Sequence, residues 1–268
     1  MTKRIIVIGI ILIVAYGLIV IGKQVLIGHY RKKADIALFL TGDYKAAIKY
    51  YSKVIDWKPD AAGCYYNRGD AYKGDDQFEN ALIDYKKSIE IGVNDSLQAI
   101  LRIALCAKEL NDLKMEEEML LRLLDLSKNK EEFENEYWAA NYNFGRLQFE
   151  KKEYRSAINY YNKAHSIKAT EYEIYHRANA YFALGQIDSA KSDLRQSLPF
   201  LKPSFIKKYP GSHLATCDSC YFPFGSEEYE LFTESIKMTI LDALSKNSNN
   251  KELMKLTDEL KSIEKSNK

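Results

Sequence analysis

The sequence predicts an all-α protein in which about five helix pairs stack into a solenoid, with a transmembrane helix before them and capping helices after them. Three observations support this fold class. A run without charge stands near the N-terminus, and small and large side chains then recur with a period of about 34 residues. In addition, only 5 prolines and 13 glycines occur among 268 residues, which disfavours a loop-rich all-β fold.

Charge and hydrophobic content exclude several classes of protein. The 39 basic and 37 acidic residues balance, which excludes the broad basic surface of a dedicated nucleic-acid-binding protein. A hydrophobic content of 46% excludes a wholly disordered chain and a membrane protein with many spans. The 4 cysteines are too few for a disulfide scaffold.

The first segment, residues 1–27, is predicted to be a membrane anchor. The stretch from Ile5 to Gly22 carries no charge and lies between Arg4 and Lys23. As a helix it is just long enough to cross a hydrocarbon core of about 30 Å. The alternative is a cleaved signal peptide, because Ala15-Tyr16-Gly17 resembles a small-residue cleavage site. We expect an uncleaved anchor, since the apolar core of a signal peptide is usually only about 7–15 residues long.

The charges that flank this run favour one orientation only slightly. Lys3 and Arg4 precede it, whereas Lys23 and the cluster from Arg31 to Lys33 follow it. Positive-inside counting therefore predicts a single-pass membrane protein with a slight lean toward a cytoplasmic body, and the side of the membrane stays open.

Residues 28–204 are predicted to form the helical repeats. In the clearest unit, from Cys64 to Ile91, large rings alternate at helical spacing with small residues that let two helices approach closely. These residues are Tyr65, Gly69, Tyr72, Phe78, Ala81 and Tyr85. The pattern resembles the tetratricopeptide repeat family, and the resemblance implies a superhelix of stacked helix pairs.

Neighbouring stretches repeat the pattern with different fidelity. Units begin near Gly28, Trp138 and Glu171, and the stretch 174–181 (IYHRANAY) echoes 65–72 (YYNRGDAY). The first unit departs from the family at Asp35, where a small residue is expected. Between Leu97 and Asn129 the spacing fits a helix pair but the small residue of its second helix is missing, and a charged insert, 127–136, follows. The whole chain resembles a membrane-anchored tetratricopeptide repeat protein of bacterial type.

The C-terminal part differs from the repeats. Residues 205–225 are expected to form a loop that contains a CxxC motif, because prolines at 199, 203 and 210 stop regular structure. Residues 226–268 are expected to form capping helices, which a solenoid needs to cover its last apolar surface. The helix that contains Tyr229 is the best candidate for this cap, and a last, polar helix has Leu253, Leu256, Leu260 and Ile263 on one face.

The resemblance also implies a concave groove lined by the first helix of each pair. Matched residue by residue, the groove positions of the family fall on Tyr66, Asn67, Asp70, Tyr142, Arg146, Phe149, Tyr175, Asn179 and Phe182. Tyrosine suits peptide capture because it offers a large contact area and a polar tip at little cost in rotamer entropy. Tyr142→Ala and Tyr175→Ala should then weaken partner binding by about 1–2 kcal/mol each. The alternative is that some of these rings only pack helix against helix, in which case both substitutions would unfold the protein.

One subgroup of the family grips a C-terminal carboxylate with lysine, asparagine and arginine side chains. Lys32, Asn67 and Arg102 match that set, whereas Ile36 and Gln98 do not. We therefore do not expect that grip in this chain.

The implied function is a membrane-tethered, non-catalytic module that binds a peptide or helix of a partner protein, as an adaptor, scaffold or assembly factor. A structural or oligomerising module at the membrane is the alternative. The sequence has no phosphate-binding loop, no dinucleotide-binding glycine motif and no HExxH motif, and its 4 histidines form no metal-spaced pair. We therefore expect no enzyme activity, no cofactor, no metal and no nucleic-acid partner.

Cys217 and Cys220 form the one local chemical motif. Such a pair serves as a redox centre, as half of a zinc site or as a small disulfide loop. His213 would be a third zinc ligand, but a fourth is not evident. A thiol or zinc module is therefore a less favoured alternative function. Cys64 and Cys106 lie in repeat helices and are expected to be small apolar packing residues.

Overall fold

The computed structural model describes residues 2–93, 96–197 and 251–266. Within these ranges every regular element is a helix, and no strand occurs. The elements are α1 (Thr2–Ile36), the π-helix η1 (Ala37–Thr41), α2 (Tyr44–Trp57), α3 (Ala62–Gly74), α4 (Phe78–Ile91), α5 (Ser96–Glu109), α6 (Leu113–Ser127), the 3₁₀-helix η2 (Glu131–Phe133), α7 (Glu134–Glu150), α8 (Tyr154–Ile167), α9 (Glu171–Ala183), α10 (Ile187–Ser197) and α13 (Lys251–Ser266). The predicted all-α helical-repeat fold is confirmed for this part of the chain.

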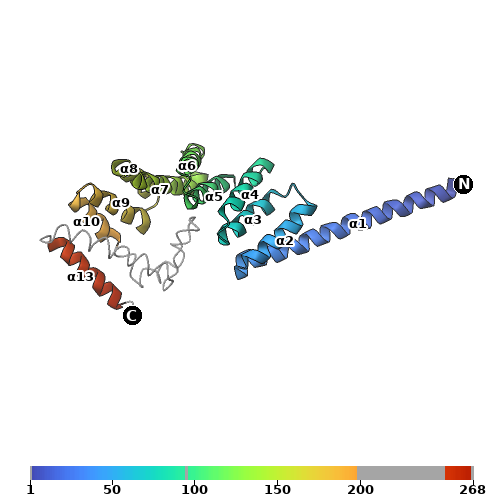
Figure 1. The fold of residues 1–268 in the computed structure, drawn as a ribbon, viewed down its shortest axis with the longest axis horizontal. Coiled ribbons are helices and arrows are strands. Elements are labelled where there is room, and N and C mark those ends of the chain that lie inside the picture. Colours follow the sequence, from blue (N-terminus) through green and yellow to red (C-terminus); the bar gives the residue numbers. More distant parts are fainter. Residues whose placement is uncertain (1, 94–95, 198–250, 267–268) are drawn as a thin grey trace. The chain divides into compact units, whose positions relative to one another are not determined.

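The chain divides into two compact units, Met1–Met119 and Leu120–Lys268, which we call the N-terminal and the C-terminal unit. In the N-terminal unit, α1 packs against α2 and α3 against α4, and the second helix of each pair also packs against the first helix of the next (Figure 1). The C-terminal unit repeats this scheme with the pairs α7–α8 and α9–α10. Each pair therefore buries its apolar face against its neighbour, as stacked repeats require.

A residue with positive φ ends the first helix of each pair and so sets the tight turn. Gly42, Asp76, Asn111, Lys152 and Gly185 have φ values of 65°, 56°, 56°, 63° and 72°. Asn111 stands between α5 and α6, so the degenerate stretch uses the same turn as the clear repeats. This left-handed conformation satisfies the last carbonyl groups of a helix while the chain reverses direction.

Two glycines let the paired helices approach closely. A Cβ atom added to Gly69 would lie 2.8 Å from the ring of Tyr85, and one added to Gly145 would lie 2.7 Å from the ring of Tyr161. Both rings are fully buried. The alternation of small and large residues in the sequence therefore reflects how the two helices of a pair pack: the ring of a tyrosine on one helix lies against the backbone of a glycine on the other.

The core of the N-terminal unit begins at Ile27, although α1 begins at Thr2. Ile27, Ala34 and Ala37 belong to one buried cluster with Ala47 and Tyr51. Large apolar side chains earlier in α1, such as Ile19, are exposed, and Figure 1 shows this part of the helix extending beyond α2.

The predicted membrane anchor requires a correction. Within the residues that the structure describes, no helix combines the length and the apolar character needed to cross a membrane. Helix α1 does not end with the apolar run but continues through Lys23 and Arg31 into the first repeat. The prediction of a single-pass membrane protein, with its lean toward the cytoplasmic side, is therefore wrong.

The C-terminal part is described only over α13. The CxxC motif, His213 and the predicted helix at Tyr229 lie outside the described residues. Helix α13 packs against α10, and its Leu256 is fully buried. The described C-terminal helix thus covers part of the last repeat.

Candidate functional site

The first helices of the repeats carry the predicted groove residues, and their polar side chains also link one repeat to the next. Tyr51 of α2 donates its hydroxyl to Asp35 at 2.6 Å and accepts a hydrogen bond from Asn67 of α3 at 3.1 Å. Asp35, the departure from the family pattern, is therefore the acceptor for a buried phenol. Asn67 is partly exposed and already bonded inside the fold.

Asp70 has the same linking role one repeat later. Its Oδ1 accepts hydrogen bonds from the hydroxyl of Tyr85 at 2.7 Å and from Nε of Arg102 at 3.1 Å. Burial disfavours the charge of Arg102, but Asp70 and then Tyr66 raise the pKa of its guanidinium above the ordinary value. Tyr66 packs edge-on against Tyr85, with ring centroids 5.7 Å apart. The predicted N-terminal groove residues Tyr66, Asn67 and Asp70 are thus gathered on α3, partly exposed.

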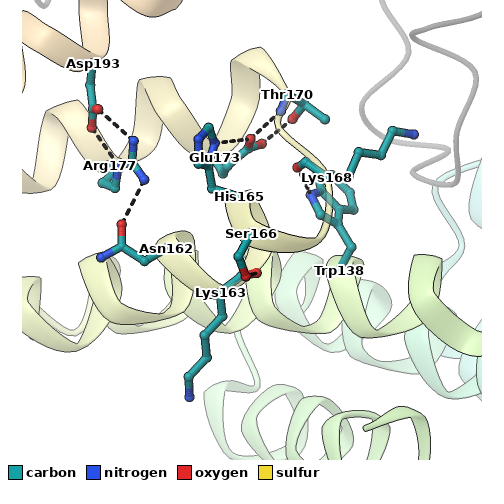
Figure 2. Close-up of polar contacts among 10 residues, drawn as sticks. All are labelled: Trp138, Asn162, Lys163, His165, Ser166, Lys168, Thr170, Glu173, Arg177 and Asp193. Carbon is teal, nitrogen blue, oxygen red and sulfur yellow. Dashed lines mark hydrogen bonds and ion pairs between the residues drawn. The ribbon is translucent and has the colours of Figure 1, made fainter. Parts of the chain in front are cut away.

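Two arginines that the sequence did not single out, the buried Arg177 and the partly buried Arg68, also join three helices each. Arg177 of α9 forms a bidentate ion pair with Asp193 of α10 and donates to Asn162 of α8, with distances of 2.7, 2.7 and 2.8 Å (Figure 2). Arg68 makes the same contacts with Asp84 and Ser52. The signal in the sequence was an arginine and an aspartate at the same separation, 16 residues, in two repeats.

In the C-terminal unit, helices α7, α8 and α9 contribute side chains to an aromatic cluster. Tyr142 stacks on Trp138, with an interplanar angle of 2°, and contacts the rings of Tyr161 and His176. Tyr175 contacts the same histidine edge-on. Tyr142 and Tyr175 are each only 6% exposed. Burial raises the pKa of the Tyr142 phenol well above its ordinary value.

The other predicted residues of the C-terminal unit are more accessible. Arg146 forms an ion pair with Glu150 one turn later on α7. Phe149 packs edge-on against Tyr154 of α8, and Asn179 and Phe182 lie on α9; all four predicted residues are partly exposed. Among these groove residues, the structure therefore separates two buried tyrosines from an accessible set of Arg146, Phe149, Asn179 and Phe182.

A buried carboxylate holds the start of α9. Thr170 donates both its backbone N–H and its hydroxyl to Glu173, and Nδ1 of His165 lies 3.2 Å from Oε1 of Glu173 (Figure 2). Burial raises the pKa of this carboxyl group, while the hydrogen bonds from Thr170 oppose the rise. Nearby, the indole Nε1 of Trp138 donates to the carbonyl oxygen of Lys168 at 3.1 Å. These contacts fix the angle between α8 and α9.

Two of the three residues that match the carboxylate-gripping subgroup, Asn67 and Arg102, make internal contacts, whereas Lys32 is exposed. Asn67 donates to Tyr51 and Arg102 to Asp70. The expectation that this chain lacks that particular grip is consistent with these bonds.

The described cysteines are packing residues. Cys64 and Cys106 are unpaired and buried, and burial raises the pKa of the Cys106 thiol to about 11. Among the described residues, no group of three or more histidine, cysteine, aspartate and glutamate side chains is arranged to hold a metal ion. Cys217 and Cys220 lie outside those residues.

Comparison with known families matches the repeats one by one. A family model described as "TPR repeat" matches residues 37–76, and one described as "Tetratricopeptide repeat" matches residues 62–91, 139–171 and 174–198. Helices α5 and α6 lie outside these matches, in keeping with their degenerate sequence. No curated protein matches the chain.

Solved structures share the fold at low sequence identity. A crystal structure of MamA is 21% identical, with a TM-score of 0.56, over 72% of this chain and 98% of the MamA chain. MamA from Desulfovibrio magneticus RS-1 is 14% identical, with a TM-score of 0.57, over 65% of this chain and 94% of its own. PilW, described as a type IV pilus biogenesis factor, is 16% identical, with a TM-score of 0.55, over 76% of this chain and 80% of its own. At these identities the likeness shows the fold alone.

Proposed function

This chain belongs to the tetratricopeptide repeat family, and we propose that it is a non-catalytic protein-interaction module. In this proposal the repeats bind a peptide or helix of a partner protein, and the chain serves as an adaptor, scaffold or assembly factor. A protein-binding scaffold is the role that the repeat fold suits best, because stacked helix pairs offer an extended surface and little enclosed volume for small-molecule chemistry.

The observation that carries the proposal is the accessible set on α7 and α9. Arg146 and Phe149 lie one turn apart on α7, as do Asn179 and Phe182 on α9, so each pair lies on one helix face. Arginine and aromatic residues are the types enriched where protein interfaces are tightest. All four side chains are partly exposed, whereas much of the remainder of these helices is packed in the core.

Tyr66, Asn67 and Asp70 are proposed as the corresponding surface of the N-terminal unit. Tyr142 and Tyr175 are proposed as support for the C-terminal surface, beneath the accessible residues. Because both rings are nearly buried, replacing either with alanine removes core packing as well as any contact to a partner. The cleaner test of binding therefore uses the accessible residues.

Site-specific photocrosslinking tests the proposal in cells. A photoreactive amino acid is placed singly at Asn179, at Phe182 and, as the control, at Arg155, an exposed residue on the second helix α8. We expect one protein to be crosslinked from Asn179 and Phe182 and not from Arg155, as identified by mass spectrometry. Equal capture from all three positions would contradict a specific surface on the first helices.

A second candidate, a self-associating structural module, is favoured by one observation. The π-helix η1 exposes Phe39 and Leu40 at 63% and 77%, and exposed apolar side chains of this size are typical of contact surfaces. Light scattering on the purified chain separates the two functions. A monomer supports the adaptor, whereas a tight homodimer that Phe39→Ser and Leu40→Ser together abolish supports self-association.

A further inference from the structure

A cavity of about 410 Å³ lies in the N-terminal unit, between α1, the end of α2 and the start of α3. Part of its wall is apolar and includes Ile27 of α1 and Val54 of α2. Two cationic side chains also line it, Arg31 on α1 and Lys58 directly after α2. A cavity that combines apolar walls with a few charged groups is typical of a ligand site.

The fold does not neutralise these two cations. The side chains of Arg31 and Lys58 are exposed, and they form no ion pair or hydrogen bond with the residues that the structure describes. Among those residues, Asp60 supplies the one carboxylate on the cavity wall. The wall therefore carries one surplus positive charge, which a single carboxylate of a ligand balances.

Two glycines leave the cavity open. Gly28 of α1 and Gly63 of α3 both line it, and a Cβ atom added to either would meet no atom within 4 Å. The close packing of paired helices that explains Gly69 and Gly145 therefore does not explain these two. Their missing side chains leave room at the wall for a group that enters from outside.

The part of the chain around the cavity is basic. From Lys23 to Asp60 it has eight basic and four acidic residues, an excess of four positive charges, compared with an excess of two for the whole chain. Two of the four carboxylates already serve the fold, since Asp35 accepts from Tyr51 and Asp43 accepts from a backbone N–H at the start of α2. None of the eight basic side chains forms an ion pair with a described residue. An acidic stretch balances several of these charges, whereas a lone C-terminal carboxylate balances one.

We propose that the cavity binds an aspartate or glutamate side chain from an acidic segment of the partner, between the guanidinium of Arg31 and the ammonium group of Lys58. The bound carboxylate accepts charge-assisted hydrogen bonds from both cations, and further acidic residues of the segment face the basic surroundings. This inference rests on the proposed function and names the chemistry of the partner. The cavity adjoins the surface proposed for the N-terminal unit, because Gly63 and Asn67 lie one turn apart on the same face of α3.

Fluorescence anisotropy with synthetic peptides tests the site in the full chain. One labelled peptide alternates glutamate with alanine and has an amidated C-terminus. A second has glutamine for glutamate and is also amidated, and a third is the second peptide with a free C-terminal carboxylate. We expect the second and third to bind at least about tenfold more weakly than the first, as the loss of charged hydrogen-bonding groups predicts. Binding of the third at the level of the first would overturn the proposal, because a lone terminal carboxylate would then suffice.

A labelled single-stranded RNA oligonucleotide tests the other macromolecule that basic surfaces attract, since its phosphates also bind lysine and arginine. We expect RNA to bind at least about tenfold more weakly than the acidic peptide. An acidic side chain on a flexible stem enters the cavity, whereas each phosphate of RNA is flanked by two sugars. RNA that binds as tightly as the acidic peptide and displaces it would overturn the assignment to a protein segment.

Charge variants then locate the binding. Arg31→Gln and Lys58→Gln should each weaken the acidic peptide at least about fivefold, with circular dichroism unchanged. Asp60→Asn should strengthen it by about two- to fivefold, because it removes a like charge from the wall. The control is Lys86→Gln, which makes the same charge change at an exposed position of α4 outside the cavity. Equal losses for all three glutamine variants would overturn the site, since only the overall charge would then matter.

A cavity-filling variant separates the cavity from the open basic surface. Gly28→Leu adds a side chain at the cavity wall without a clash and should weaken the acidic peptide at least about fivefold. Gly22→Leu is the matched control, because Gly22 also lies on α1 with nothing within 4 Å but does not line the cavity. Equal affinity of wild type and Gly28→Leu would overturn the proposal, because the peptide would then bind outside the cavity.

The failure of this inference is distinguishable from the failure of the proposed function. Absence of acidic-peptide binding, together with capture of one partner from Asn179 and Phe182, overturns the acidic-segment site and leaves the proposed function standing. Absence of both overturns the proposed function as well.

Discussion

At the scale of single residues, the close packing of two helix pairs depends on glycine, which has no side chain. Gly69 and Gly145 have no Cβ, and the ring of a tyrosine from the second helix fills the resulting space in both repeats. Helical glycine is unfavourable by about 1 kcal/mol relative to alanine, so its use at these positions reflects packing rather than helix formation. The same residue type at Gly63 of α3 meets nothing within 4 Å.

Gly69→Ala is therefore expected to destabilise the protein, in spite of the better helix propensity of alanine. Its Cβ would overlap the ring of Tyr85, and overpacking a core of this kind typically costs about 1–3 kcal/mol. Gly63→Ala, on the same helix, should stabilise by about 0.5–1 kcal/mol. Urea unfolding followed by circular dichroism measures both. A stabilising Gly69→Ala would show that Tyr85 has room to move.

Arg177 and Asp193 form a second residue-scale feature that is buried and fully bonded. Asp193→Ala should lower the free energy of unfolding by about 3–5 kcal/mol, because it leaves the guanidinium of Arg177 without its bidentate partner in a buried site. Urea unfolding followed by circular dichroism gives the value.

The matched control for this pair is Asp188→Ala. Asp188 pairs with Lys191 on α10, but its side chain is 96% exposed, and exposed pairs contribute about 0–1 kcal/mol. Similar losses for the two alanine variants would mean that the charge of α10, and not the buried pair, sets the stability.

At the scale of helices, the turns between paired helices share one backbone device, a residue with positive φ. Glycine, asparagine and aspartate tolerate this conformation and occupy four of the five turns, whereas Lys152, at φ 63°, ends α7 with a side chain that does not favour it. The α7–α8 turn is thus the one among these five that holds a strained residue.

Lys152→Gly should stabilise the protein by about 0.5–1 kcal/mol, because glycine adopts the left-handed conformation without a steric penalty. The neighbouring substitution Lys151→Gly is the control, since Lys151 has an ordinary φ of −72° and gains nothing there. Thermal unfolding by differential scanning calorimetry ranks the variants. The order Lys151→Gly above Lys152→Gly in stability would contradict this account of the turn.

At the scale of the whole molecule, buried phenols link stability to pH. Burial raises the pKa of Tyr51, Tyr85 and Tyr161 well above the ordinary value of about 10. Their contribution to stability is fully present below pH about 10 and is lost as the pH rises toward their folded values, because the unfolded chain releases protons that the folded chain retains.

The free energy of unfolding should therefore fall above pH about 10, by up to about 1.4 kcal/mol per pH unit for each of these phenols. Urea unfolding across this pH range measures the slope. Tyr161→Phe should reduce the slope by the share of one phenol. A stability that is independent of pH above 10 would show that these hydroxyls ionise freely in the folded protein.

The repeat architecture was predictable because its signals are local. The small-and-large register that predicted the helix pairs depends on contacts within one repeat, such as Gly69 with Tyr85. The membrane prediction, which also rested on a local pattern, was wrong, because no helix among the described residues combines the length and apolar character needed to cross a membrane. Helix α1 continues without a break into the first repeat, where Ala34 belongs to the same buried cluster as Ala47 of α2.

From the sequence, the candidate site was predictable only as a set of positions within the repeat pattern. The repeat pattern of the family predicted that Tyr142 and Phe182 both line the groove. In the structure Tyr142 is surrounded by the rings of Trp138, Tyr161 and His176, whereas Phe182 is partly exposed. Burial of Tyr142 depends on Trp138 and Tyr161 of its own repeat and on His176 of the next one, and the repeat pattern does not specify which rings surround a given position.

The sequence by itself determined that this protein is a stack of tetratricopeptide-type helix pairs, because helix periodicity and close packing within a pair are short-range properties. Only the tertiary structure decided which polar groups satisfy one another within and between repeats. Asp35 and Asp70 accept from buried tyrosines, Arg68 and Arg177 join three helices each, and the hydroxyl of Tyr161 makes no hydrogen bond within the described residues. Hydrogen bonding between repeats requires a distance and a direction in space, and residue spacing along the chain does not specify them.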